Sequence, residues 1–208
     1  MKENGYYYVD LGLPSKTMWA TCNVCANKPE DYGLLFQFGR VDGYRYGDIN
    51  NKFRTNAQNL EDGSTSEYIP ITSSGKTYNV NDILDLVDDA AHVNMGGKWM
   101  MPTRAQYIEM FNNTMHKVET INGVKGMLFT SKINNKRLFI PFVGYWYNGG
   151  FASAGSNANV WSSQVHPSYV NNAYSLYCNS CGDACIYSDF DRSYAFSVRG
   201  VFKKITSL

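Results

Sequence analysis

Short runs of apolar, aromatic and β-branched residues, separated by turn residues, open the chain. They cover residues 6–11, 17–24 and 33–38, and each has the length and composition of a β-strand. Gly12-Leu13-Pro14-Ser15 predicts the turn between the first two runs. Residues 42–80 are rich in Gly, Asn, Ser and Thr and only weakly periodic, so we interpret them as a long, irregular insertion.

The spacing of apolar residues becomes helical in the middle of the chain. Asn81 is a good N-cap, and the pattern that follows it ends at Met95-Gly96-Gly97. One face of this predicted helix consists of Ile83, Leu84, Leu86, Val87, Ala90 and Ala91.

A second helix is predicted directly after Pro102. Thr103 and Gln106 have the spacing of a capping box, in which each side chain binds the backbone N–H of the other residue. The expected buried face of this helix consists of Tyr107, Met110 and Phe111.

The β pattern returns after the second helix. Residues 124–131 and 137–141 flank Ile133-Asn134-Asn135-Lys136, which predicts a hairpin turn. Residues 160–165 form another predicted strand. Helices therefore occupy the middle of the chain and strands both ends, which indicates an α+β fold with antiparallel strands, built as a single domain over residues 1–208.

The C-terminal segment alternates with a period of two. We expect Tyr174, Leu176 and Cys178 to point inward and Ser175, Tyr177 and Asn179 to point outward. The inner face of a last strand would consist of Phe196, Val198, Gly200 and Phe202. Between these two strands, residues 180–195 are expected to form a loop, and a loop of that length in a compact domain is usually functional or disordered.

Composition and charge exclude several classes of protein. The formal net charge is +1 and no run of like charges occurs, so we expect no nucleic-acid partner. The longest apolar run, residues 138–147, contains Pro141 and is too short to span a bilayer, so no membrane insertion is expected. No secretory signal peptide is visible near residue 1.

The chemistry-bearing residues point to no catalytic or metal centre. The five cysteines form C-x-x-C at Cys22 and Cys25 and C-x-x-C-x-x-x-C at Cys178, Cys181 and Cys185. Their spacing leaves a zinc site, a disulfide and free thiols open, with free thiols favoured. No P-loop, dinucleotide motif, metal-hydrolase motif or nucleophile elbow occurs. We predict a protein that is not an enzyme, with no cofactor and no bound metal.

Six segments resemble one family in sequence order. They read YYYVDLGLPSKTMWATCNV, GGKWMMPTRAQYIEMF, LFIPFVGYW, VWSSQV, AYSLY and FSVRGVF. They are similar to the Fibrobacter succinogenes major paralogous domain, a branch of the C-type-lectin-like fold related to formylglycine-generating enzymes. Four positions depart from the family pattern, and we expect each to lie at the surface or in a turn: Cys25, Met101, Gln106 and Gly200.

The resemblance implies a binding function. Related lectin-like domains are variable proteins of diversity-generating retroelements, among them phage receptor-binding proteins such as the major tropism determinant and bacterial surface proteins. In these systems, adenines of AAC and AAT codons near the 3′ end of the gene are randomised. The partner would be a cell-surface protein or glycan receptor, and the location a phage tail or a bacterial surface. The oligomeric state is left open.

Amino-acid usage in the C-terminal segment supports this implication. Randomising the adenines of AAC or AAT never produces Lys, Glu, Gln, Met or Trp. These five types make up about a fifth of residues 1–164, yet residues 165–202 contain none of them. Tyr, Ser, Asn, Gly and Asp, which favour adaptable binding surfaces, are abundant there.

The candidate ligand-binding residues lie within a variable region of about residues 165–195. They are Tyr169, Asn171, Asn172, Ser175, Tyr177, Asn179, Cys181, Asp183, Cys185, Tyr187, Ser188, Asp189, Asp191, Ser193 and Tyr194.

Two other functions fit the fold that the resemblance implies. A formylglycine-generating-enzyme-like oxidoreductase would use Cys181 and Cys185 as a redox or copper-binding pair. A glycan-binding lectin would act without calcium, because Trp161 is followed by Ser162-Ser163 and the triplets typical of calcium-dependent lectins are absent.

Overall fold

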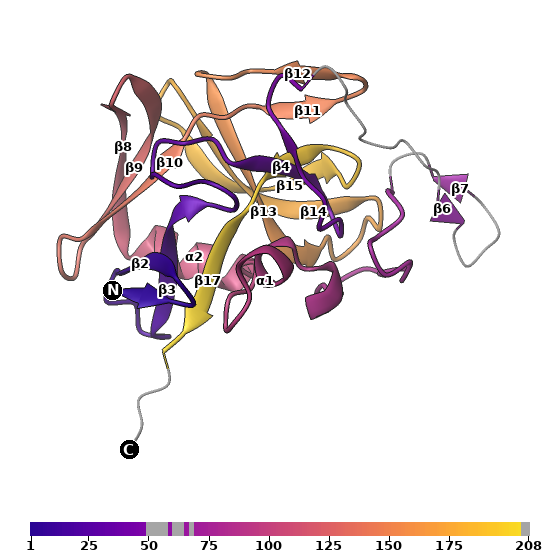
Figure 1. Ribbon diagram of the computed structural model, residues 1–208, viewed down its shortest axis with the longest axis horizontal. Coiled ribbons are helices and arrows are strands. Elements are labelled where there is room, and N and C mark those ends of the chain that lie inside the picture. The colour runs from indigo at the N-terminus through magenta and orange to yellow at the C-terminus, as the bar shows by residue number, and fades with distance from the viewer. Residues whose placement is uncertain (49–57, 60–64, 67–68, 205–208) are drawn as a thin grey trace.

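The computed structural model describes residues 1–48, 58–59, 65–66 and 69–204 (Figure 1). In these ranges the chain is mostly β-sheet, with two short α-helices that lie between N-terminal and C-terminal strands along the sequence. This arrangement is compatible with the predicted α+β class. Much of the predicted insertion lies outside the described residues.

The first sheet joins distant parts of the chain. Its order is β1-β2-β3-β17 and all of its pairs are antiparallel. The first two predicted strands are present in it. Its members are β1 (Lys2–Glu3), β2 (Tyr6–Asp10), β3 (Thr17–Asn23) and β17 (Arg199–Lys203).

The second sheet is an antiparallel three-stranded meander, which we call the small sheet. Its order is β10-β9-β8, from β8 (Thr114–Ile121), β9 (Val124–Ser131) and β10 (Arg137–Pro141). The predicted hairpin between β9 and β10 is confirmed. Asn135 takes a φ of 60° in the turn, a left-handed conformation that Asn tolerates better than most residues.

The third sheet is the largest, and its main path runs β12-β11-β16-β13-β14-β15. Strand β4 pairs with β16 and β5 pairs with β4. One pair departs from the antiparallel expectation, because β16 runs parallel to β13. Its members are β4 (Leu34–Gln37), β5 (Tyr44–Arg45), β11 (Tyr145–Tyr147), β12 (Gly150–Ala152), β13 (Asn157–Val165), β14 (Asn172–Asn179), β15 (Ala184–Asp191) and β16 (Ala195–Ser197). A separate short pair consists of β6 (Gln58–Asn59) and β7 (Thr65–Ser66).

The first helix is shorter than predicted and begins later. Asn81 is not its cap: it has a φ of 66°, and the next residues bond to β13, with the Leu84 N–H donating to the Ser163 carbonyl at 2.9 Å. A 3₁₀ turn (η1, Leu86–Asp88) and the helix α1 (Ala90–Met95) follow. Asp89 is extended and caps α1 by accepting from the His92 N–H at 2.8 Å. The apolar residues Ile83, Leu86 and Val87 are consequently about half exposed.

The second helix agrees with its prediction. Helix α2 (Arg104–Asn112) begins after Thr103, and both bonds of the capping box with Gln106 are present. Tyr107 and Met110 are buried and Phe111 is partly buried. Two of the four departures from the family pattern, expected at the surface or in turns, are buried instead. Met101 is 4% exposed, and Gly200, which the strand alternation had placed on an inner face, packs against Met95 and Trp99.

Two apolar clusters pack against the third sheet. One contains Leu176, Cys178 and Val160 together with α2 and the small sheet. The other contains Trp161, Phe196 and Phe36, with α1 at its edge. The third sheet is therefore covered on both faces around β13, which limits how much of it can carry exposed binding residues.

Buried Asp89 predicts a pH-dependent stability. Burial raises the pKa of its carboxyl from 3.8 to about 6, against the opposing bonds from the backbone N–H groups of His92 and Met101. The native state therefore binds more protons than the unfolded state between these values. The stability from this proton uptake is present below pH 3.8 and is lost as the pH rises through about 6.

Asp89→Asn should flatten that part of the pH profile. We expect the free energy of unfolding of the wild type, relative to the variant, to fall by about 2–3 kcal/mol between pH 4 and pH 7. Urea unfolding of both proteins at several pH values measures it. A constant difference across this range would show that Asp89 keeps an ordinary pKa.

Candidate ligand-binding surface

Most of the predicted variable residues lie on one β-hairpin, not on a loop. The expected loop over residues 180–195 is wrong, because Ala184–Asp191 forms β15 and pairs with β14. The apolar contacts explain this strand. Ala184 and Ile186 lie opposite Cys178 and Leu176 and pack against the same core cluster. Polar neighbours hid this alternation in the sequence.

The tip of the hairpin is shaped by Asn179. Its side-chain oxygen accepts from the N–H groups of Cys181 and Asp183 at 2.9 and 3.1 Å, and its amide donates to the Asp183 carboxylate at 2.9 Å. Gly182 supplies the left-handed position of the turn, with a φ of 97°. Asn179 therefore builds the turn, and Cys181 and Asp183 are the exposed residues that it presents.

Ser175 was predicted to face outward, and this prediction is wrong. It is 0% exposed, and its hydroxyl has no hydrogen-bond partner among the described residues. On β14 the alternation is interrupted, since the register with β15 shifts between Ala173 and Ser175. Ser175 lies opposite Trp161 on β13, where the second core cluster covers the sheet. Ser193 is likewise buried, at 6% exposed.

Four aromatic rings lie together on the third sheet, around the buried ring of Phe196. Tyr145 and Tyr147 come from β11, Phe190 from β15, and Tyr194 from the turn before β16; we call these four the aromatic platform. Tyr147 and Tyr194 stack with centroids 3.9 Å apart and planes at 7°. All four are partly exposed, and Tyr145, Phe190 and Tyr194 pack on the buried ring of Phe196. Burial raises the pKa of Tyr194 to about 12, so its hydroxyl stays protonated.

The other end of the hairpin meets the connection between β13 and β14. A shallow hollow of about 510 Å³ lies there, lined by residues 168–172, and it includes the predicted Tyr169, Asn171 and Asn172. Tyr169 is 63% exposed and stacks on His166 at 4.9 Å.

Arg192 fixes this connection from beneath. It is 0% exposed, and its Nη1 donates to the carbonyls of Val170 and Tyr78 at 3.2 and 3.1 Å. Its backbone N–H donates to the Asn171 carbonyl at 2.8 Å. Burial lowers the pKa of the guanidinium to about 10, so it still carries its charge at neutral pH.

The predicted residues thus gather at two ends of a hairpin about 25 Å long. Cys181 and Asp183 lie at the tip, and Tyr169, Asn171, Asn172 and Asp191 lie at the base. Tyr177 and Cys185 face each other along the body and are partly exposed. Tyr187, Ser188 and Asp189 lie on β15, and their side chains are outside the described residues.

The five cysteines form no disulfide. All five are free thiols, and burial raises the pKa of Cys178 and of Cys185. Among the described residues, no three His, Cys, Asp or Glu side chains come together as a metal site would require. No helix in the described ranges has the length and apolar sequence needed to cross a membrane.

Sequence reasoning missed four residues of this surface. Tyr145, Tyr147 and Phe190 complete the aromatic platform, and Arg192 supports the base. The alternation Tyr145-Trp146-Tyr147 was a usable signal, since a buried Trp between two tyrosines places both of them on the opposite face of a strand.

Comparison of the chain with protein-family models, with curated proteins and with solved structures gave no match.

Proposed function

We propose that the chain is a ligand-binding display domain whose C-terminal hairpin is diversified by a retroelement. One observation carries the proposal: residues 165–202 contain no Lys, Glu, Gln, Met or Trp. A fifth of the preceding chain consists of these types, so about seven would be expected by composition alone. Adenine randomisation of AAC and AAT codons excludes these same five.

The position of this segment supports the proposal. Cys181 and Asp183 at the hairpin tip and Tyr169 at the base are exposed, while Leu176 and Cys178 anchor the same hairpin in the core. Exposed substitutions away from such anchors usually change stability by less than about 0.5 kcal/mol. The scaffold can therefore keep its fold while the exposed residues change.

The proposal includes the C-type-lectin-like fold and a surface location. Strand β3 pairs with β17, which brings the two ends of the domain together. The hairpin of β14 and β15 lies at one edge of the third sheet. We propose a cell-surface protein or glycan as the receptor, and a phage tail or bacterial surface as the location.

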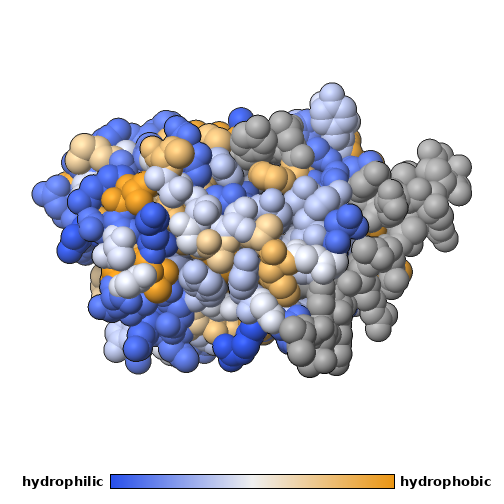
Figure 2. Space-filling model, turned by 90° about the horizontal axis from the view of Figure 1, so that it is seen from above, coloured by the Kyte–Doolittle hydropathy of each residue, from blue (hydrophilic) through white to orange (hydrophobic). Residues whose placement is uncertain are grey.

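The surface offers two means of recognition. In the described sheet, β15 has a neighbour only on its β14 side, and an edge strand can pair with an extended partner segment. The partly exposed rings of the aromatic platform supply contact area with few rotatable bonds. Figure 2 looks from above onto the edge where β11 and β12 lie, and hydrophobic residues appear there in small separate groups among polar ones.

A redox function of Cys181 and Cys185 is not favoured. Burial, together with the charge of Asp183, raises the pKa of the Cys185 thiol. A reactive cysteine needs its pKa lowered, since the thiolate is the reacting form. The described surroundings of Cys185 therefore work against this chemistry.

The gene and its surroundings test the diversification directly. We expect a near-copy of the 3′ end of the gene, with adenines at the variable codons, next to a reverse-transcriptase gene. Codon choice adds a check only at amino acids that also have codons ending in A or G, because every Tyr, Asn, Asp and Cys codon already ends in C or T. Ser188 is therefore expected to have a codon ending in C or T, and a codon ending in A or G there would count against the proposal.

Two matched libraries test whether the hairpin can serve as a display surface. One would randomise Tyr177, Cys181, Asp183 and Cys185, and the other Ala173, Ser175, Leu176 and Cys178. We expect most members of the first library to stay protease-resistant and most members of the second to be degraded, because the second set is buried. Equal survival of both libraries, or loss of the first, would contradict the proposed use of this surface.

A further inference from the structure

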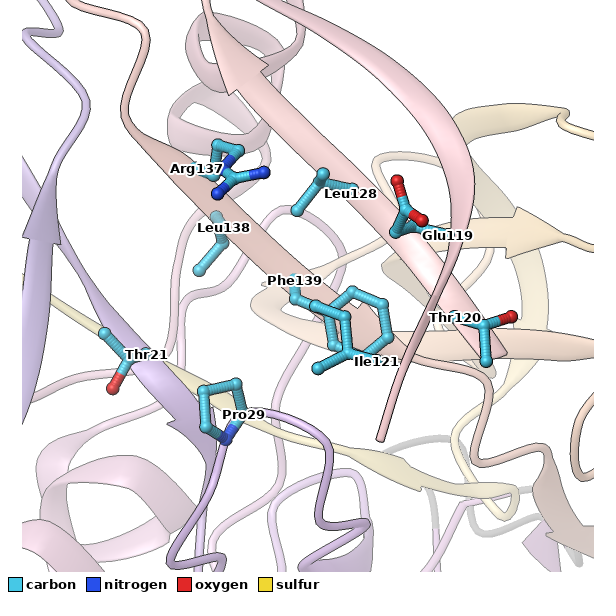
Figure 3. Close-up of a pocket in the computed structure, with 9 residues that line it drawn as sticks. All are labelled: Thr21, Pro29, Glu119, Thr120, Ile121, Leu128, Arg137, Leu138 and Phe139. Atoms are coloured by element: carbon cyan, nitrogen blue, oxygen red, sulfur yellow. The ribbon is translucent and has the colours of Figure 1, made fainter. Parts of the chain in front are cut away.

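A cleft of about 540 Å³ lies between the outer face of the small sheet and a wall formed by β3 and the segment that follows it. Figure 3 shows Thr21 and Pro29 facing the side chains of the small sheet across an open space. None of the residues that line the cleft belongs to the C-terminal hairpin, so this cleft is independent of the proposed display surface. Its volume lies in the range of small-molecule sites.

The floor of the cleft is apolar although it belongs to the outer face of the sheet. Leu128 of β9 and Phe139 of β10 lie opposite each other in register, and each is only 4% exposed. Gly126 makes room for the Phe139 ring, because a Cβ atom there would meet the ring at 2.5 Å. Ile121 closes the end of the floor. An apolar ligand group that binds here removes its own surface from water, while little water has to leave the floor.

The two sides of the cleft are joined at one end. The side-chain amide of Asn122, in the turn between β8 and β9, donates to the Glu30 carboxylate at 2.7 Å. Glu30 follows Pro29 directly, so this bond connects the wall containing Pro29 to the small sheet. The cleft is therefore formed before a ligand binds, which reduces the ordering cost of binding.

Two charged side chains line the rim, Glu119 and Arg137, and only Glu119 forms an ion pair among the described residues. Glu119 forms an ion pair with Lys117 at 2.7 Å. Arg137 lines the same cleft and is exposed, and among the described residues its guanidinium forms no hydrogen bond or ion pair. The hydrogen bond from Lys117 holds the pKa of the Glu119 carboxyl below its ordinary value, and the charge of Arg137 contributes a smaller part. Arg137 is thus a cation with its donors available beside an apolar floor.

We propose that this cleft binds a small organic carboxylate whose apolar body rests on Leu128 and Phe139 and whose carboxylate pairs with Arg137. A planar guanidinium offers two parallel N–H groups that match a carboxylate, and the apolar floor lies beside it to receive the rest of the ligand. The hydroxyl of Thr21 on the facing wall is a further polar contact within the cleft.

Phenylbutyrate and its neutral amide are suitable probes, because they share one apolar body and differ in the group offered to Arg137. Isothermal titration calorimetry at neutral pH would measure both against the whole chain. We expect the carboxylate to bind about tenfold more tightly than the amide, a difference worth ~1.4 kcal/mol. Arg137→Gln should remove this preference while leaving the weaker binding of the amide unchanged.

Lys136→Gln is the matched control, since it removes the same charge one residue away and outside the cleft. It should leave the preference for the carboxylate intact, whereas Ile121→Asp should weaken both probes by disturbing the floor. Absence of phenylbutyrate binding to the wild type, or equal binding by Arg137→Gln, would overturn the proposal. Circular dichroism of each variant separates lost binding from lost folding. Neither result bears on the hairpin.

Discussion

Arg199→Met should lower the free energy of unfolding by about 3 kcal/mol, a large share of the stability of a typical domain. Arg199 is 0% exposed and donates three hydrogen bonds of 3.1 Å, to the Asn23 side chain and to the carbonyls of Ala20 and Phe139. These bonds connect β17 to β3 and to β10. Methionine fills much of the same volume but leaves all three acceptors without their donor.

The free-energy cost of burying the Arg199 charge opposes this prediction. Burial lowers the pKa of Arg199 to about 10, which means that the buried charge itself costs free energy. Replacing buried charges with apolar side chains has stabilised other proteins. The three bonds should prevail here, since each unmade bond to a buried acceptor costs about 1–3 kcal/mol.

Urea unfolding of Arg199→Met beside Arg104→Met gives the measurement. Arg104 is exposed, with its guanidinium over the Tyr174 ring at 5.0 Å, so its loss should cost no more than about 0.5–1 kcal/mol. A variant at position 199 that is as stable as the wild type would show that the desolvation cost outweighs the bonds.

Trp161→Ala should cost about 3–5 kcal/mol and should also loosen the aromatic platform. The Trp161 ring is 0% exposed, packs on Phe196 at 4.2 Å, and donates from Nε1 to the Phe36 carbonyl at 2.8 Å. Phe196 in turn supports Tyr194. Loss of the Trp161 ring would therefore leave a cavity directly beneath the surface that we propose binds ligands.

Trp161→Phe separates the ring from the hydrogen bond. It keeps an aromatic ring under Phe196 but cannot donate to the Phe36 carbonyl, so we expect a smaller loss than for alanine. Thermal unfolding reports the stability, and near-ultraviolet circular dichroism reports the order of the tyrosines above. A fall of less than about 1 kcal/mol in the free energy of unfolding of Trp161→Ala would contradict this prediction. It would mean that neighbouring side chains fill the space of the missing ring.

Elements specified by neighbouring residues were predictable from the sequence. The capping box at Thr103 and the turn at Asn135 act over a few residues, so α2 and the hairpin of β9 and β10 appear where they were expected. The first helix was misplaced because its apolar spacing continued upstream of Asp89. There, backbone bonds from Leu84 to β13 outweigh the helical spacing, and these depend on a strand about 80 residues away.

The candidate surface was predicted in part for a similar reason. Exposure at Cys181, Asp183 and Tyr169 agrees with the polar, tyrosine-rich composition of the segment. Burial of Ser175 does not follow from its neighbours in sequence, since it lies opposite Trp161 of β13, where a core cluster drawn from distant parts of the chain covers the sheet. An alternating strand predicts which residues share a face, but it does not predict what other elements cover that face.

The pairing of β17 with β3 has a consequence for how the domain acquires its structure. Arg199 and Asn23 are 176 residues apart, so the first sheet is completed only through a contact of very long sequence separation. Such topologies fold slowly, and a chain emerging from the ribosome cannot complete this one until its last strands are made. Under the function that we propose, each version of the hairpin is synthesised before this closure. A version that disturbs packing would then be exposed to proteases as an incomplete domain before it could meet a receptor.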